Sequence, residues 1–579
     1  MHSKQQTGEF IVINRRDRYS FLALGLVIAI SCHLVGRPAQ AQSAGEMKTV
    51  AMVTLGGYDA LVEDINFVGS LVGQPQMSMG MEQMLAMFTQ DRGLAGLDKS
   101  RPIGLLVQSD GMTFLGALCI PVTSLPELLD VLQAFELSSD DQGDGVFQLE
   151  YQNQPFFAKE KNGWAFISPM KEMIENLPDD PGQDFSTLTS QYDLGVQINV
   201  QNVPEPIRQM AVEKVKDLTA GQHRHPGESD EAFEQRKEIT KSQMDQFQRA
   251  IDEIAELTVG IALDEQQQRA YLEYSFVAVE GTQLAVQFQE NSDPKTNFSG
   301  FFQPDAAAMM SFSSKIGESE KAQVEQMFEM MRKQVRTAID EESEIPNEEA
   351  RDVLKSACDD FLDSFRSTIQ AGVMDGGMVL TLAPDALTLV VGGFVGDTEK
   401  VESGLKKIAD LAKEEPDFPG VQWDASKHAD IDFHTLSVPI PESETEPRQM
   451  FGDDVEMAVG IGEQSVFFAL GRDCLDAVKR VIDVSAANPE KPVPPMEFTI
   501  ALGQVMEVVA SFADDEDRQQ LEMIASMLAE ETTGRDHVRM VVQPIPNGQR
   551  VRIEVEEGVL RAIGMAVMAA QAQPAGAAF

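Results

Sequence analysis

The residues whose types and spacing most invite chemistry are methionines. Five of them fall within residues 77–87: they are Met77, Met79, Met81, Met84 and Met87. Thioether sulfur is a soft ligand, and Met-rich segments of exported proteins can bind Cu(I). Methionine is also flexible and polarizable, so the same cluster suits a packed core or a groove for an apolar ligand. We expect core packing, because a strongly acidic chain gains nothing by exposing five large apolar side chains together, and the apolar groove is the second interpretation.

An acidic stretch at residues 140–145 begins like a calcium-binding loop. Its sequence, DDQGDG, places oxygen ligands at loop positions 1, 3 and 5, from Asp140 to Asp144, and the required glycine at position 6, Gly145. The twelfth position, however, is Tyr151 instead of glutamate, and the pattern after the loop predicts a strand where the calcium motif needs a helix. We therefore interpret the stretch as an acidic turn, with calcium binding as the open alternative.

Acid–base, nucleophilic and cofactor chemistry have no recognisable motif in this chain. The seven histidines form no HExxH pair, and there is no GxSxG elbow, Walker loop or CxxC pair. Beyond residue 41, cysteine occurs only at Cys119, Cys358 and Cys474, which are too widely spaced for a disulfide framework, although any two of them can still pair. We predict a protein that is not an enzyme and that uses no cofactor and no metal.

The net charge of the chain excludes some classes of binding partner. The 579 residues include 46 lysines and arginines against 93 aspartates and glutamates, which gives a formal net charge of −47. Such a polyanion repels phosphate backbones, so nucleic-acid binding is excluded, and anionic membrane surfaces are disfavoured. The hydrophobic fraction of 43% is that of a globular protein, and the length suggests more than one domain.

The beginning of the chain predicts export. Residues 1–41 contain a basic segment, then an apolar run, then small residues at Ala39 and Ala41, so signal peptidase is expected to cleave before Gln42. The apolar run is roughly 15 residues long, shorter than the ~20 that span a bilayer. An uncleaved anchor, a lipidated Cys32 and a twin-arginine signal are weaker alternatives. We expect the mature protein in the periplasm, at the cell envelope or outside the cell, with no integral membrane span.

The order of the expected elements occurs twice along the chain. A hairpin at 103–120 leads into a helix at 124–137, and roughly 275 residues later a hairpin at 378–394 leads into a helix at 398–412. Each half also ends in a long charged helix, a hairpin and a short helix. Hairpins that feed helices predict antiparallel sheets with helices packed on one face, which is an α+β class.

The repeat predicts an internal duplication. We expect a first α+β half at 46–293 and a second at 294–570, each with the same topology. The remaining residues, 571–579, are mostly small and are expected to form a flexible tail.

One short region resembles a known group of proteins. Residues 96–104, with the sequence GLDKSRPIG, are followed by Val107, Asp110 and Gly111. This pattern resembles a group of secreted proteins of planctomycete-type bacteria, a group without an established activity, so the resemblance implies export and transfers no site residue. Together these observations predict a noncatalytic exported protein of the cell envelope that acts by binding or as a structural component. The alternative is a carrier of a lipid-like apolar ligand, held between a sheet and Met-rich helices. A protein partner or an apolar ligand is expected, and the oligomeric state is left open.

Overall fold

The protein is an α+β structure built on one very large antiparallel sheet. The computed structural model describes residues 47–174, 178–220, 230–342, 345–383, 385–416, 418–513, 515–530 and 535–572. In these residues, 15 α-helices accompany a 20-stranded sheet and a two-stranded sheet. The predicted fold class and the antiparallel pairing are confirmed. The predicted signal peptide, with Ala39, Ala41 and Gln42, lies outside the described residues, as does the tail from residue 573 onward.

Ten strands of the sheet come from the first half of the chain. They pair in the order β4-β5-β6-β7-β3-β2-β1-β8-β9-β10. Their bounds are β1 Lys48–Leu55, β2 Ile103–Ser109, β3 Phe114–Pro121, β4 Ser138–Asp141, β5 Val146–Tyr151, β6 Gln154–Lys161, β7 Trp164–Ser168, β8 Leu194–Asn199, β9 Ile254–Asp264 and β10 Arg269–Ala278. The edge strand β4 is short and acidic, which discourages pairing with another chain.

The other ten strands come from the second half. They pair in the order β15-β16-β17-β18-β14-β13-β12-β20-β21-β22. Their bounds are β12 Ala308–Lys315, β13 Val373–Ala383, β14 Ala386–Phe394, β15 Gln422–His428, β16 Ile431–Pro439, β17 Asp454–Ile461, β18 Ser465–Gly471, β20 Met496–Ala501, β21 His537–Ile545 and β22 Gly548–Glu556. The short strands β11 (Lys295–Thr296) and β19 (Lys491–Pro492) form the separate two-stranded sheet.

The two sets of strands meet where β10 pairs with β22. Nine residue pairs form this junction, from Arg269 opposite Glu556 to Val277 opposite Gly548. Counted from the outer edge of either set, the hairpins predicted at 103–120 and 378–394 both occupy the fifth and sixth places. The two halves therefore form one continuous sheet instead of two separate sheets.

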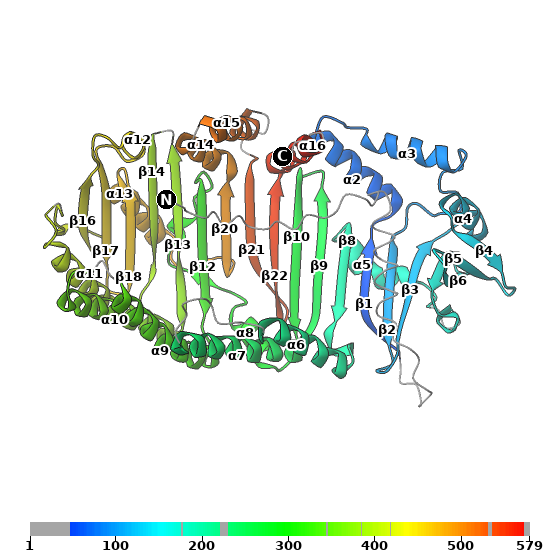
Figure 1. Cartoon of the computed structure of the whole chain (residues 1–579), viewed down its shortest axis with the longest axis horizontal. Coiled ribbons are helices and arrows are strands. Elements are labelled where there is room, and N and C mark those ends of the chain that lie inside the picture. Colours follow the sequence, from blue (N-terminus) through cyan, green and yellow to red (C-terminus); the bar gives the residue numbers. More distant parts are fainter. Residues whose placement is uncertain are drawn as a thin grey trace.

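The helices gather mainly at the two ends of the strands. Figure 1 shows α2, α3, α14, α15 and α16 along one end and α6, α7, α8, α9 and α10 along the other. The bounds in the first half are α2 Tyr58–Leu71, α3 Met77–Phe88, α4 Leu125–Leu132, α5 Pro181–Thr189, α6 Glu205–Ala220, α7 Asp230–Glu253 and α8 Gln283–Glu290. In the second half they are α9 Glu318–Glu341, α10 Glu348–Ala371, α11 Thr398–Ala412, α12 Thr445–Phe451, α13 Cys474–Ala487, α14 Leu502–Phe512, α15 Asp515–Glu530 and α16 Glu557–Ala572.

Local sequence explains where several helices begin. The side chains of Ser124, Asp180 and Asp397 each accept a hydrogen bond from a backbone N–H in the first turn of α4, α5 and α11. Proline follows the cap of α4 and α5, where its missing N–H costs nothing. Between β7 and α5, the described residues form a single 3₁₀ turn, Lys171–Ile174.

The expectation that helices pack on one face of the sheet is wrong. Leucines of α4 pack with Ile120, whereas Phe185 of α5 packs with Cys119, the next residue along β3. Successive residues of a strand point to opposite faces, so α4 and α5 lie on opposite sides of the sheet. In the second half, α13 packs on Phe433, Phe467 and their neighbours, on the same side as α5.

Glycines let aromatic side chains approach the strands closely on the side that α5 and α13 cover. A Cβ added at Gly377 of β13 would lie 2.6 Å from the carbonyl oxygen of Met310 and 2.8 Å from the Cβ of Phe301. Phe301 is fully buried in the core cluster of the second half. The absence of a side chain at Gly377 is therefore what admits this ring.

We expect Gly377→Ala to destabilise the protein by about 1–3 kcal/mol, because the added methyl group overpacks a filled core. The matched control is Gly116→Ala in β3, where an added Cβ meets no atom within 4 Å. That control should change the free energy of unfolding by less than about 0.5 kcal/mol. Denaturant unfolding of both variants checks this, and equal stabilities of the two would contradict the packing described for Phe301.

Candidate ligand-binding surface

One face of the sheet carries a continuous line of apolar side chains, which we call the apolar row. Each member is paired with the next across neighbouring strands. The members are Leu55, Leu194, Ile261, Leu272, Ile553, Met540, Phe498, Met310, Met378, Val391 and Phe468. The row crosses eleven strands, from β1 to β18, and at about 4.8 Å per strand it is about 48 Å long.

Two further rows flank the apolar row on the same face, because their members are two residues away along each strand. One consists of Val53, Val196, Val259, Tyr274, Val551, Val542, Met496 and Phe312. The other consists of Leu263, Ala270, Val555, Val538, Ile500, Ala308, Leu380, Leu389 and Leu470. We call the three rows together the apolar face, and none of its members is charged.

The apolar face is most open to solvent at β8–β10 and at β14 and β18, whereas Val551 and Ala308 in its middle are buried. Its most exposed members have relative exposures from 36% for Phe468 to 45% for Ile261. The exposed members are Leu194, Val259, Ile261, Leu272, Val391 and Phe468. In Figure 1 the middle of the strands lies between the two lines of helices. Single exposed apolar residues are normal on a protein, but neighbouring ones, such as Leu194, Ile261 and Leu272, are typical of an interaction surface.

The opposite face of the same strands holds a network of charged side chains at the junction of the halves. Glu273 of β10 is completely buried. Nε and Nη2 of Arg552 both lie 2.6 Å from its Oε2, and Nε of Arg550 lies 3.0 Å from its Oε1. The hydroxyl of Tyr192 also donates a hydrogen bond to Glu273. Burial, together with this carboxylate, raises the pKa of Tyr192.

This junction network ties β10 to β22 and extends to neighbouring strands. Glu554 of β22 contacts Arg269 of β10 at 3.2 Å and Arg539 of β21 at 3.4 Å. Nε of Arg539 donates to Glu497 of β20 at 2.8 Å. The polar side chains of these strands are therefore held on one face, which leaves the apolar face without charge.

The methionine cluster forms α3, and the expectation that it belongs to the core is wrong. Met79, Met84 and Met87 are exposed, Met87 to 70%, while Met77 and Met81 are half-buried. The physical reason is that α3 packs mainly on α2, which covers one side of the helix and leaves the other side exposed. There, Gly69 leaves room for Met77, and the backbone N–H of Ser78 donates to Asn66 at 3.1 Å.

Because they are exposed, Met79→Ala and Met84→Ala should each change stability by less than about 0.5 kcal/mol. Leu71→Ala in the adjacent helix α2 serves as the buried control, since Leu71 is 6% exposed, and should cost about 2–5 kcal/mol. Thermal melts of the three variants test this contrast. A loss for Met79→Ala as large as that for Leu71→Ala would contradict the exposed position of α3.

The other residues singled out from the sequence have ordinary structural roles. Residues 140–145 connect β4 to β5, and the carboxylate of Asp141 accepts a hydrogen bond from the N–H of Gly143, so the predicted acidic turn is confirmed. The three described cysteines are free thiols. Cys119 and Cys474 are buried, and burial raises the pKa of both, that of Cys474 to about 11.

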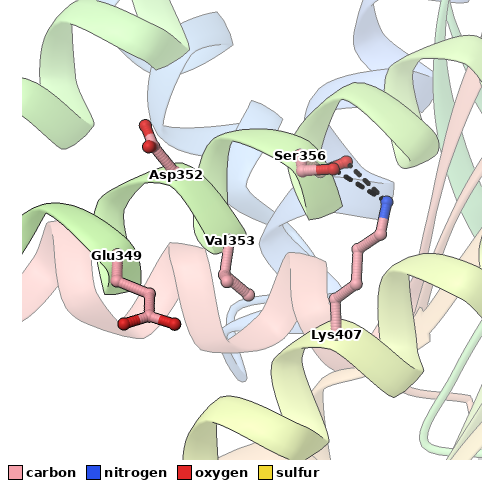
Figure 2. A pocket seen from close by; sticks show the side chains of 5 residues that line it. All are labelled: Glu349, Asp352, Val353, Ser356 and Lys407. Carbon is pink, nitrogen blue, oxygen red and sulfur yellow. Dashed lines mark hydrogen bonds between the residues drawn. The ribbon is translucent and has the colours of Figure 1, made fainter.

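A shallow hollow of about 470 Å³ lies between α10 and α11. Figure 2 shows Glu349, Asp352, Val353 and Ser356 on α10 and Lys407 on α11. The Nζ of Lys407 donates to the hydroxyl of Ser356 at 2.8 Å. This ammonium also pairs with a buried carboxylate, Asp360, so the lysine serves to hold the two helices together.

Asp360 is the centre of the contacts between α10 and α11. It pairs with Lys400 at 3.0 Å and with Lys407, and it accepts a hydrogen bond from Ser403 at 2.7 Å. Burial alone would raise its pKa, but the hydrogen bonds from Lys407, Ser403 and Lys400 outweigh burial and lower the pKa to about 2.

We expect Asp360→Asn to lower stability by about 1–2 kcal/mol at pH 7, because both lysines keep partial access to water. A lowered carboxyl pKa stabilises the fold above the unfolded value near 4, and this contribution is lost as the pH falls from about 4 to about 2. The difference from the wild-type protein should therefore shrink over that interval. Asp410→Asn, which removes an exposed pair with Lys413, is the control and should have little effect at any pH. A difference that is independent of pH would contradict the ion-pair account.

The candidate surface is therefore defined by the geometry of this chain alone. No protein-family model, curated protein or solved structure matches the chain. In the part of the chain that the structure describes, no helix is both long and apolar enough to cross a membrane. The same residues contain no cluster of three or more histidine, cysteine, aspartate or glutamate side chains arranged for a metal ion.

Proposed function

We propose that the protein is a noncatalytic, exported binding protein of the cell envelope whose apolar face takes up the acyl chains of a lipid-like ligand. The observation that carries this proposal is the exposure of six apolar side chains, four on β8, β9 and β10 and two on β14 and β18, on a face with no charged member. The alternative of a structural component is less well supported, because a purely structural sheet would bury this face.

The chemistry of the apolar face favours acyl chains over a protein partner. Protein interfaces carry about one hydrogen bond per 100–200 Å². Here the backbone groups of the interior strands are paired with one another, and the side chains offer almost no donors or acceptors. Four of the 28 side chains are methionines, which adapt to ligands of varied shape. A second copy of the chain is disfavoured by repulsion between net charges of −47.

We also infer that the two halves descend from an internal duplication. The support is that both sets of ten strands pair in the same order, and that α5 and α13 follow the fourth strand from the edge and cover the same face. Sequence profiles of homologues of the two halves test this inference. A match along the whole order of strands is expected, and profiles that fail to align would contradict it.

Native mass spectrometry of the protein purified from its own envelope tests the proposed function. We expect the protein to retain one or more lipid masses that disappear on delipidation and return on incubation with a phospholipid. A protein that carries no lipid and binds none on incubation would contradict the proposal. A retained metal ion in place of lipid would contradict it as well.

A further inference from the structure

The exposed side of α3 consists mainly of methionines. With about 100° per residue, Met79, Gln83 and Met87 follow one line along the helix, and Gly80 and Met84 lie beside them. All five residues are exposed. The single charged residue of α3, Glu82, is also exposed but lies toward the edge of this side. The solvent-facing side of this 12-residue helix therefore carries methionine side chains, where a surface helix normally carries charged ones.

The sequence around α3 is neutral in a chain that is otherwise strongly acidic. Residues 65–109 contain three acidic side chains, Glu82, Asp91 and Asp98, and three basic ones, Arg92, Lys99 and Arg101. Their net charge is zero, whereas the whole chain has a net charge of −47. This region can therefore approach an apolar surface without the electrostatic repulsion that the rest of the molecule brings.

We propose that α3 inserts its methionines into the surface of a zwitterionic lipid bilayer and so holds the protein at the membrane where its ligand is exchanged. This inference rests on the proposed function, because the contact with the membrane would serve the exchange of the lipid-like ligand. At 1.5 Å per residue the helix is about 18 Å long, too short to span a bilayer, so it lies in the plane of the interface.

The position of α3 suits this role. It packs mainly on α2, with its last residue, Phe88, 6.4 Å from the ring of Phe135, and Figure 1 shows it at one end of the long sheet, beside the ends of the strands. Methionine side chains enter the boundary between headgroups and acyl chains without leaving a charge unpaired there. A bilayer contact at this end would leave the middle of the apolar face free for ligand.

Flotation with phosphatidylcholine vesicles tests the proposal. We expect the wild-type chain to float with the vesicles and the variant Met79→Glu/Met87→Glu to lose at least five-fold in the bound fraction. Met523→Glu, at an exposed methionine of α15, is the matched control and should float like the wild type. Adding phosphatidylglycerol should weaken the binding of the wild type, because the chain is acidic, and salt should restore it.

A second measurement separates this inference from the proposed function. Binding of a fluorescent fatty acid in the absence of vesicles should be the same for Met79→Glu/Met87→Glu as for the wild type. A wild-type protein that stays unbound, or a double variant that floats like the wild type, would overturn the role of α3. Loss of fatty-acid binding in the double variant would also overturn it, because α3 would then belong to the ligand site itself.

Discussion

Glutamate in place of Leu272 or Val391 is expected to weaken binding of an acyl-chain ligand at least tenfold. Both residues belong to the apolar row and are exposed, so the substitutions should leave the folded structure intact. A bound acyl chain would cover the new carboxylate and remove its water, and burying an unpaired charge costs several kcal/mol. Tenfold corresponds to about 1.4 kcal/mol, so even partial desolvation produces the effect.

Val484→Glu is the matched control for Val391→Glu. Val484 lies on α13, the helix that covers the other side of the sheet, and is 47% exposed, compared with 38% for Val391. Titration of the three variants with a fluorescent phospholipid measures the affinity directly. Equal affinities for Val391→Glu and Val484→Glu would place the ligand away from the apolar face.

The second large effect concerns the junction of the two halves. Replacing Glu273 by Gln should lower the stability of the protein by about 2–4 kcal/mol, because Arg550 and Arg552 then lose the carboxylate that neutralises them. This loss of stability is smaller than for a fully buried ion pair, because both arginines are about one quarter exposed and keep some contact with water. Glu402→Gln, which removes a helical surface pair with Lys406, should cost less than about 0.5 kcal/mol.

A double-mutant cycle separates the ion pair from a general effect of the substitution. The variant Glu273→Gln/Arg552→Gln should lose less stability than the sum of its two single changes, because the second change removes a charge that the first left unpaired. Denaturant unfolding supplies the four free energies. Simple additivity would show that the junction network does not hold β10 to β22.

Much of the secondary structure could be predicted from the sequence, because its periodicity is strong. The helix expected at 398–412 has those bounds in the structure. The helix α5 was missed because Pro181 and Gly182 at its beginning resemble a turn. The joining of both halves into one sheet could not be predicted, since it depends on pairing residues of β10 and β22 that are nearly 280 positions apart.

The apolar face was missed because its pattern differs from the usual alternation of polar and apolar residues. In β9 the larger side chains Val259 and Ile261 alternate with Thr258, Gly260 and Ala262. The small residues are buried, Gly260 against the ring of Tyr192, and the large ones are exposed. Alternation of large and small residues on strands is the signal that indicates such a face. The methionine cluster, in contrast, is evident in the sequence, but its expected place in the core is wrong, because Met79, Met84 and Met87 are exposed.

Photo-crosslinking in the living cell tests most directly whether the apolar face binds lipid. A benzophenone amino acid would replace Ile261, and separately Val484 on the opposite side of the sheet. The account predicts that the first variant forms an adduct with the mass of one lipid, whereas the second forms none. An adduct of position 261 with another protein, or the same lipid yield at both positions, would contradict it.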